Sequence, residues 1–434
     1  MVQGRRTAVL HIRPATTLRG SIRIPGDKSI SHRYVMLGGI ALGTTTITNL
    51  APGADVAATI DCMRGLGARV VECGADAVTV TGEGWSGLQT PAGPLDARNS
   101  GTTMRLLAGL VAGRPLTAIL IGDASLERRP MARVIDPLTT MGAAIQSEAG
   151  HAPLTIRGQR LHGVEWTPAV PSAQVKSAIM LAALSAHGAS TIIERLPTRD
   201  HSERAFPAFG LTCDVRDGRI RVPGGQDAAA AAGPLEVPGD PSSAAVWAAA
   251  AAALPGSSVV LEHVCLNPRR LGFVGALAKL GALIQLAETQ QSGGEPVGSL
   301  TVTHGGHGSC TIGAAEVPDV IDELPVLAAR AALGGALDVT GAAELRVKES
   351  DRITALVTGL RNLGVDAEER PDGFIVRGTA RPSGGTADAA GDHRLVMAFA
   401  VVGLGARGAT SITGADAVAV SYPAFAADLA RLRQ

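Results

Sequence analysis

The chain has 434 residues, of which 46% are apolar, so it is long enough to bury several hydrophobic cores. Lysine plus arginine equals aspartate plus glutamate at 39 each, and aromatic residues make up only 3%. This balance excludes the basic field and the stacking surface of a typical nucleic-acid-binding protein.

The cysteines and the lengths of the apolar runs indicate the cellular compartment of the protein. The cysteines are odd in number, widely spaced and without a metal-ligand pattern: Cys62, Cys73, Cys213, Cys265 and Cys310. We therefore expect neither a disulfide framework nor a zinc site. The first residues lack the apolar core of a signal peptide, and apolar runs stay below about 18 residues. A cytoplasmic protein without a membrane partner is expected.

Six strands are predicted along the chain, each opening with a glycine and continuing as an alternating, β-branched run. The intervals between these glycines are 70, 75, 68, 79 and 73 residues, which indicates an internal repeat. The glycines are Gly43, Gly113, Gly188, Gly256, Gly335 and Gly408.

A buried helix is predicted before each of these strands, because an apolar segment of about a dozen residues opens there with a polar cluster. The openings are PGDKSISHR (25–33), NSGTTMR (99–105), SAQVKSA (172–178), PGDPSSA (238–244), IDELPV (321–326) and DHRLVM (392–397). Other helices are expected to end at a left-handed glycine in LGARV (66–70), MGAAI (141–145), LGALI (280–284) and LGVDA (363–367).

The repeats predict two domains. The two Pro-Gly-Asp segments lie 238 − 25 = 213 residues apart, close to three periods. One crossover is expected at the Ala/Gly-rich stretch 224–234 and the other near Arg23–Gly26. We therefore predict an N-terminal domain, 26–238, and a C-terminal domain, 239–434, completed by residues 1–25. The two crossover strands would form the hinge.

The first turns of the predicted helices collect charged and hydroxyl residues. A helix start offers unpaired N–H groups and a partial positive charge, which suit phosphate or carboxylate. Lys28, Ser29 and Arg33 can face one ligand from the first two turns, whereas ordinary capping is the alternative. Arg129 lies in a stiff basic loop that could equally be solvated surface.

Two later segments carry candidate acid and base groups. Lys348 and Arg352 are expected on one helical face beside Glu349, with an exposed salt-bridged helix as the alternative. Asp322 opens an apolar helix, where its pKa could be tuned for base catalysis. Arg394 opens another apolar helix. No phosphate loop, dinucleotide fingerprint, nucleophile elbow or HExxH motif is present, which argues against the enzyme classes that use them.

The ordered set of motifs closely resembles the EPSP synthase family of enolpyruvyl transferases, from about residue 17 to 430. The motifs are PGDKSISHR, NSGTTMR, ERRPM, SAQVKSA, PGDPSSA, IDELPVLA, RVKESDRI, DHRLVMA and SYPAF. The resemblance implies an α/β, two-domain fold of six βαβαββ-type units, three per domain, around buried parallel helices. It also implies transfer of the enolpyruvyl group of phosphoenolpyruvate to the 5-hydroxyl of shikimate 3-phosphate, without metal or organic cofactor. A monomer is expected.

The resemblance also implies the site residues. The groups for phosphoenolpyruvate would be Lys28, Gly101, Arg129, Gln174, Arg352 and Arg394. Those for shikimate 3-phosphate would be Lys28, Ser29, Arg33, Ser172, Ala173, Gln174, Arg199, Asp322 and Lys348, with Ala173 acting through its backbone. Catalysis would use Asp322 as the base for the hydroxyl, Glu349 as the proton carrier at C3, and Lys28 in an assisting role.

Two positions depart from the family pattern. Arg98 stands where many members carry glycine, and Val420 stands where some carry a lysine that contacts phosphoenolpyruvate. Two alternatives remain. A sister transferase that acts on UDP-N-acetylglucosamine would have a Lys-Asn pair and a loop cysteine, whereas this chain has Lys28-Ser29 and no cysteine between Cys73 and Cys213. A non-catalytic anion-binding protein of the same fold is the other. With Gly101 intact, inhibition by glyphosate is expected.

Overall fold

The computed structural model describes residues 8–433 and divides into two compact units. Unit 2 comprises residues 26–238 and, from a later part of the chain, residues 291–295. Unit 1 comprises the remaining described segments, up to Pro25, from Gly239 to Gln290, and from Pro296 onward. Residues 291–295 therefore belong to a different unit from the segments that flank them.

Unit 2 contains three sheets, ordered β14-β3-β5-β4 with β15 also on β3, then β6-β7-β9-β8, then β10-β11-β13-β12. The strands of the first are β3 (Ala41–Thr48), β4 (Arg69–Glu72), β5 (Val78–Glu83), β14 (Ala228–Ala229) and β15 (Leu235–Glu236). The second has β6 (Leu95–Asp96), β7 (Thr117–Ile121), β8 (Ala144–Glu148) and β9 (His151–Arg157). The third has β10 (Glu165–Trp166), β11 (Ser190–Ile193), β12 (Asp214–Arg216) and β13 (Arg219–Val222).

Unit 1 also contains three sheets, ordered β17-β18-β16-β2, β19-β20-β22-β21 and β1-β24-β23. The strands of the first are β2 (Arg19–Arg23), β16 (Ser258–Cys265), β17 (Ala282–Ser292) and β18 (Glu295–His304). The second has β19 (Ser309–Ile312), β20 (Ala336–Val339), β21 (Asp366–Arg370) and β22 (Gly373–Arg377). The third has β1 (Val9–Ile12), β23 (Gly385–Asp388) and β24 (Thr410–Thr413).

The six predicted glycine-led strands are the ones at the heart of these sheets: β3, β7, β11, β16, β20 and β24. Each pairs antiparallel with one neighbour and in parallel on its other side, with one strand or, for β3, with the two short strands β14 and β15. The antiparallel neighbour normally follows in the chain, but β24 receives the N-terminal β1 instead. The predicted repeat of mixed α and β units is therefore confirmed.

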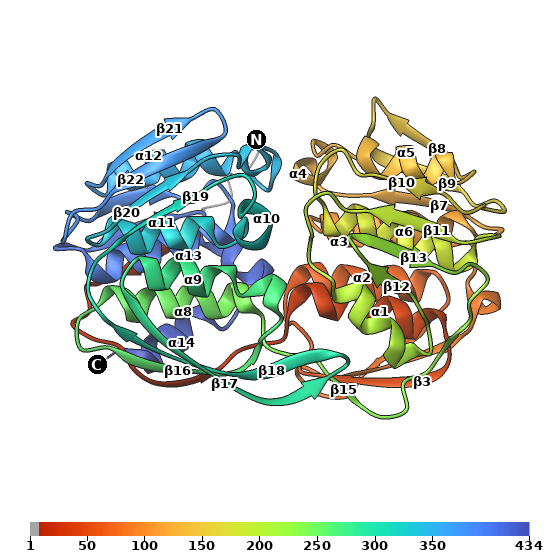
Figure 1. Cartoon of the computed structure of the whole chain (residues 1–434), viewed down its shortest axis with the longest axis horizontal. Helices are drawn as coiled ribbons and strands as arrows, with labels where there is room; N and C mark the ends of the chain where they lie inside the picture. Colours follow the sequence, from red (N-terminus) through yellow and green to blue (C-terminus); the bar gives the residue numbers. More distant parts are fainter. Residues whose placement is uncertain (1–7, 434) are drawn as a thin grey trace, which may run out of the picture. The chain divides into compact units, whose positions relative to one another are not determined.

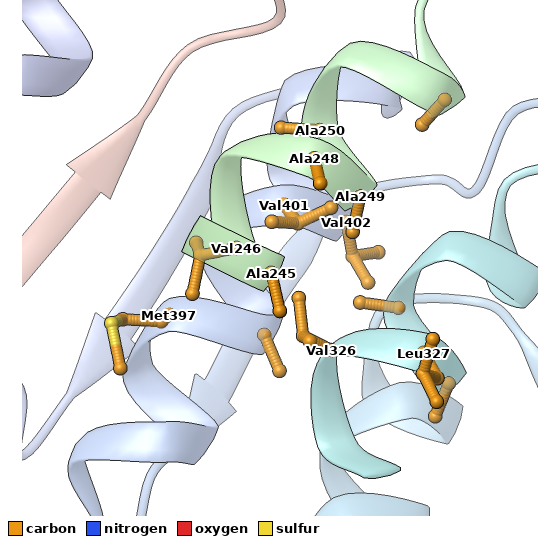
Figure 2. Close-up of a cluster of buried hydrophobic side chains, with 14 of the residues drawn as sticks. Ala245, Val246, Ala248, Ala249, Ala250, Val326, Leu327, Met397, Val401 and Val402 are labelled. Atoms are coloured by element: carbon orange, nitrogen blue, oxygen red, sulfur yellow. The ribbon is translucent and has the colours of Figure 1, made fainter. Parts of the chain in front are cut away.

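The helices that precede these strands are buried. They are α1 (Lys28–Ile40), α3 (Gly101–Ala112) and α6 (Ala173–Ser185) in unit 2, and α8 (Pro241–Ala253), α11 (Leu324–Ala332) and α13 (His393–Gly405) in unit 1. In unit 1, α8, α11 and α13 lie inside the strands that surround them (Figure 1). Alanines and valines fill the space where they meet, because small side chains allow close helix packing (Figure 2).

A second set of helices lies against the sheets: α2 (Ala54–Gly65), α5 (Ala132–Thr140), α9 (Gly272–Lys279) and α12 (Arg352–Asn362). The glycines predicted to end them all have positive φ: Gly67, Gly142, Gly281 and Gly364. The shorter helices are α4 (Ala124–Glu127), α7 (His201–Ala205), α10 (Val317–Val320) and α14 (Phe425–Leu432).

The prediction that Lys348 and Arg352 lie on one helical face is wrong. Lys348 directly follows a short 3-10 helix, Ala343–Val347, and α12 begins only at Arg352. Asp351 separates the two because its side chain accepts a hydrogen bond from Thr354 N and caps α12. Because Asp351 caps a new helix here, the i, i+4 spacing of Lys348 and Arg352 does not place them on one helical face.

Candidate functional site

The first turn of α1 carries Lys28. Asp27 caps the helix by accepting a hydrogen bond from Ile30 N at 2.9 Å. Lys28 Nζ donates to Asp55 Oδ2 at 2.8 Å, and both side chains are largely buried. Lys28 is thus held at a helix start, where its charge adds to the positive end of the helix.

The first turn of α3 lies beside two guanidinium groups. A Cβ on Gly101 would lie 2.8 Å from Arg105 Nη1 and 3.4 Å from Arg129 Nη1. Arg129 is buried, and its Nη2 donates to Asn99 Oδ1 at 2.7 Å. Glycine therefore leaves the start of α3 open for a small anion between its N–H groups and two cations.

Gln174 connects α6 to the same place. Its Oε1 accepts from Arg105 Nη1 at 2.5 Å, and its Nε2 donates to Thr102 Oγ1 at 2.9 Å. Ser172 caps α6 by accepting from Val175 N, and Ala173 is the first helical residue. Of the predicted residues in unit 2, the structure thus brings Gly101, Arg129 and Gln174 together.

Arg33 occupies a second polar site in unit 2, where all three of its nitrogens donate. The acceptors are Ser202 Oγ at 2.8 Å, Ser29 O at 2.7 Å and Ser177 Oγ at 2.6 Å. Burial lowers the pKa of the guanidinium to about 10, with Arg199 adding to the effect and Glu203, Asp27 and Glu295 opposing it. Arg33 and Arg199 therefore form a positive site close to Ser29.

In unit 1, Arg352 is buried among three carboxylates. Its Nε donates to Asp392 Oδ2 at 2.6 Å, its Nη2 bonds to Glu349, and its Nη1 lies 3.6 Å from Asp322 Oδ1. Burial alone would lower the pKa of Arg352, but Asp392, Glu349 and Asp322 prevail and raise it. The arginine therefore remains a cation that holds two predicted acid–base residues, Asp322 and Glu349.

Arg394 and Lys348 complete this group. Arg394 donates to the carbonyl oxygen of Asp322 at 3.0 Å, and its Nη2 lies 3.5 Å from Asp322 Oδ2. Lys348 Nζ lies 3.6 Å from Glu344 Oε1. Burial lowers the pKa of the Lys348 ammonium, while Glu344 and Asp322 oppose this. All five predicted residues of unit 1 thus lie in one cluster.

This cluster has the parts needed for anion binding and proton transfer. Arginines offer forked donors that match phosphate and carboxylate oxygens. Asp322 and Glu349 are only partly exposed, with 17% and 18% of their side chains accessible, so a substrate proton could reach them.

Three residues in these clusters were missed from sequence: Asp55, Arg105 and Asp392. Arg105 and Asp392 lie inside the motifs NSGTTMR and DHRLVM, one as an i+4 neighbour of Gly101 and the other as a helix cap. Those positions were the available signal. Asp55 lies outside the quoted motifs, and its pairing with Lys28 depends on how α2 packs on α1.

The structure shows the surroundings of the two departures from the family pattern. Arg98 adopts a φ of 52°, in the left-handed region that favours glycine. Its Nη2 bonds to Asp61 Oδ2 at 2.6 Å, so the extra cation is paired. Val420 ends the 3-10 helix Ala415–Val420 and is half-buried.

Residues 8–433 contain neither a membrane-spanning helix nor a candidate metal cluster. No helix there is long and apolar enough to span a membrane. No group of three or more His, Cys, Asp and Glu side chains there could hold a metal ion.

Comparison with known proteins reveals strong similarity over almost the whole chain. The family model described as EPSP synthase (3-phosphoshikimate 1-carboxyvinyltransferase) matches residues 12–429. A 3-phosphoshikimate 1-carboxyvinyltransferase of Alkalilimnicola ehrlichii is 47% identical over 418 residues, covering 96% of this chain and 93% of the relative. That of Lactiplantibacillus plantarum is 45% identical over 428 residues, covering 98% and 99%.

Solved structures give the same result. An EPSP synthase from Acinetobacter baumannii superimposes with a TM-score of 0.86 at 38% identity, and the match covers 98% of each chain. The α/β fold of two domains expected from the resemblance is confirmed by this similarity.

Proposed function

Because the chain belongs to the EPSP synthase family, we propose that it transfers the enolpyruvyl group of phosphoenolpyruvate to the 5-hydroxyl of shikimate 3-phosphate. The products are 5-enolpyruvylshikimate 3-phosphate and phosphate. The observation that carries the proposal is the cluster in unit 1, where Arg352 holds Asp322 and Glu349. A family match across residues 12–429 supports it.

Phosphoenolpyruvate is a small anion with a phosphate and a carboxylate, and it requires several cations. We assign its binding to Lys28, Gly101, Arg129, Gln174, Arg352 and Arg394. Gly101 contributes backbone at a helix start beside Arg105 and Arg129. Gln174 is fixed by hydrogen bonds to Arg105 and Thr102, so its amide is already oriented.

Shikimate 3-phosphate carries a phosphate, a carboxylate and two free hydroxyls on its ring. We assign its binding to Lys28, Ser29, Arg33, Ser172, Ala173, Gln174, Arg199, Asp322 and Lys348. Arg33 and Arg199 supply positive charge, and Ala173 supplies the backbone of the first turn of α6. Lys348 and Asp322 come from unit 1.

The reaction is an addition followed by an elimination. Asp322 accepts the proton of the 5-hydroxyl as the hydroxyl oxygen bonds to C2 of phosphoenolpyruvate. Glu349 donates a proton to C3, which gives a tetrahedral intermediate. Glu349 then takes a proton back from C3 as the bond from C2 to the phosphate oxygen breaks, and the proton held by Asp322 passes to the departing phosphate. Lys28 assists the proton transfers, and the arginines stabilise the phosphate that leaves.

The wider properties follow from this assignment. We propose that the chain segments at Pro25–Gly26 and Pro238–Gly239 serve as the hinge between a domain of residues 26–238 and one of 239–434 with 1–25. The enzyme uses no metal or organic cofactor, acts as a cytoplasmic monomer, and is inhibited by glyphosate. The acceptor is shikimate 3-phosphate and not UDP-N-acetylglucosamine, because Lys28 is followed by Ser29.

Phosphate release from phosphoenolpyruvate tests the assignment. We expect release with shikimate 3-phosphate and none with UDP-N-acetylglucosamine. Absence of release with the first acceptor would sink the proposal.

A second measurement tests the proton carrier. Glu349→Gln keeps the shape of the side chain but removes its proton, so kcat should fall on the order of 100-fold or more with little change in substrate binding. Glu369→Gln is the matched control, since Glu369 pairs with Arg346 at 3.0 Å in the same unit. Equal turnover in the two variants would remove Glu349 from its role.

A further inference from the structure

A buried chain of hydrogen bonds joins three helices of unit 2 through residues without a role in the reaction described above. His32 of α1 bonds through Nδ1 to Thr59 Oγ1 of α2 at 2.6 Å. Thr59 Oγ1 bonds to Thr103 Oγ1 of α3 at 2.7 Å, and Thr103 Oγ1 donates to Ser100 Oγ at 2.7 Å. Each of the four residues is at most 1% exposed.

The donor and the acceptor of each hydrogen bond in this chain can be assigned by starting from the Ser100 end. Thr103 has one hydroxyl proton, which it shares between Ser100 Oγ and the carbonyl oxygen of Asp55, so it accepts the proton of Thr59. Thr59 must then accept from His32, which places a hydrogen on Nδ1. Nε2 of His32 is buried and has no hydrogen-bond partner among the described residues. A bare acceptor there is consistent with a neutral ring, and burial lowers the pKa of His32 to about 3.

This chain reaches the proposed phosphoenolpyruvate groups at two of its members, Ser100 and Thr103. Ser100 caps α3 by also accepting from Thr103 N at 3.1 Å, and Gly101 follows it directly. Thr103 Oγ1 lies 3.3 Å from the carbonyl oxygen of Asp55, whose carboxylate holds Lys28. The chain thus ties the first turn of α3 to the first turn of α2.

We propose that His32, Thr59 and Thr103 are positioning residues for phosphoenolpyruvate, because their hydrogen bonds fix the N–H groups at Gly101 relative to Lys28. This inference rests on the proposed function. A site for two small anions requires such precision, since a displacement of about 1 Å in a catalytic arrangement costs on the order of 100-fold in rate. In this scheme the imidazole of His32 and the hydroxyls of Thr59 and Thr103 do not contact a substrate.

Removing one hydroxyl tests the inference. Thr59→Val keeps the shape of the side chain and breaks the chain at its centre. We expect the KM for phosphoenolpyruvate to rise on the order of tenfold, with a much smaller change in the KM for shikimate 3-phosphate. Thr59→Ser restores the hydroxyl and should return the KM to within about twofold of the wild-type value.

Thr45→Val is the matched control. Thr45 is 1% exposed and accepts a hydrogen bond from Ala231 N at 3.2 Å, so its replacement also removes a partly buried hydrogen bond in unit 2. Both valine variants should lower the melting temperature, but Thr45→Val should leave both KM values unchanged. A wild-type KM for phosphoenolpyruvate in Thr59→Val would overturn the inference and reduce the chain to a packing role.

Thr103→Val is the second variant, used if Thr59→Val does not fold, and the same change in KM is expected from it. Turnover by the wild-type enzyme distinguishes failure of the positioning role from failure of the proposed function. If the wild-type enzyme turns over and the KM for phosphoenolpyruvate is unchanged in Thr103→Val or Thr59→Val, only the positioning role is overturned. Absence of wild-type turnover with both substrates overturns the proposed function itself.

Discussion

Lys28 and Asp55 form an ion pair with Nζ 2.8 Å from Oδ2, and no more than 18% of either side chain is exposed. A cation proposed to assist catalysis is thus oriented by a carboxylate from the next helix. We expect Asp55→Asn to lower kcat on the order of 10- to 100-fold, because Lys28 loses its fixed position. Steady-state kinetics with both substrates would measure this.

Asp61→Asn is the control for that change. Asp61 lies on the same helix, α2, and pairs with Arg98 at 2.6 Å, but about half of its side chain is exposed. Exposed ion pairs contribute little, so this variant should keep its activity. If Asp55→Asn were as active as Asp61→Asn, Lys28 would not depend on its partner.

Gly101→Ala should weaken binding of phosphoenolpyruvate. The new Cβ would lie 2.8 Å from Arg105 Nη1 and 3.4 Å from Arg129 Nη1, so at least one guanidinium must move. We expect the KM for phosphoenolpyruvate and the inhibition constant for glyphosate both to rise, since both ligands would occupy this position. Gly113→Ala is unsuitable as a control because its Cβ would clash with Ser185, whereas Gly93 has open space around it. Gly93→Ala should leave both constants unchanged.

Arg98 offers a test of backbone strain. Its φ of 52° suits glycine, and both Arg98→Gly and Arg98→Ala remove the ion pair with Asp61. Only glycine relieves the left-handed conformation, which costs other residues about 1 kcal/mol or more. We therefore expect Arg98→Gly to be more stable than Arg98→Ala in denaturant unfolding. A more stable alanine variant would contradict the argument from strain.

His32 should make the stability of the protein depend on pH. Its pKa is lowered from 6.5 to about 3 by burial, so below pH 6.5 the unfolded chain binds a proton that the folded protein does not. The free energy of unfolding must therefore fall as pH falls from 6.5 toward 3. The loss from this residue should reach about 2 kcal/mol at pH 5.

His32→Gln should remove that part of the pH dependence. Denaturant unfolding of both proteins at pH 7 and pH 5 would measure it, because the variant's lower baseline stability cancels in the difference between the two pH values. The exposed His187→Gln serves as the control and should follow the wild type. Parallel behaviour of His32→Gln and the wild type would show that His32 does not titrate as described.

The repeat was predictable from sequence because it depends on local rules. Alternating β-branched runs gave the six central strands, and glycines such as Gly67 and Gly364 marked helix ends that need positive φ. The placement of polar groups at helix starts is also local, so most of the candidate residues could be named. The similarity to relatives then supplied the chemistry that composition could not.

What the sequence did not predict depends on packing between distant segments. Asp55 reaches Lys28 only because α2 packs on α1, and Arg352 is held by Asp392, 40 residues later. Residues 291–295 join unit 2 through contacts such as the 2.6 Å bond between His201 Nδ1 and Glu295 Oε1. Nothing in the local pattern of that hairpin indicates its partner.

The pairing of β1 with β24 has a consequence for synthesis of the chain. Val9 lies opposite Thr413, so β1 leaves the ribosome long before the strand that it pairs with. At roughly 5–20 residues per second, that delay is on the order of 20–80 s. All strands of the three sheets within residues 26–238 have been synthesised well before then. We therefore expect unit 2 to be protected from protease in nascent chains that still lack β24, while β1 remains open to cleavage until β24 has been synthesised.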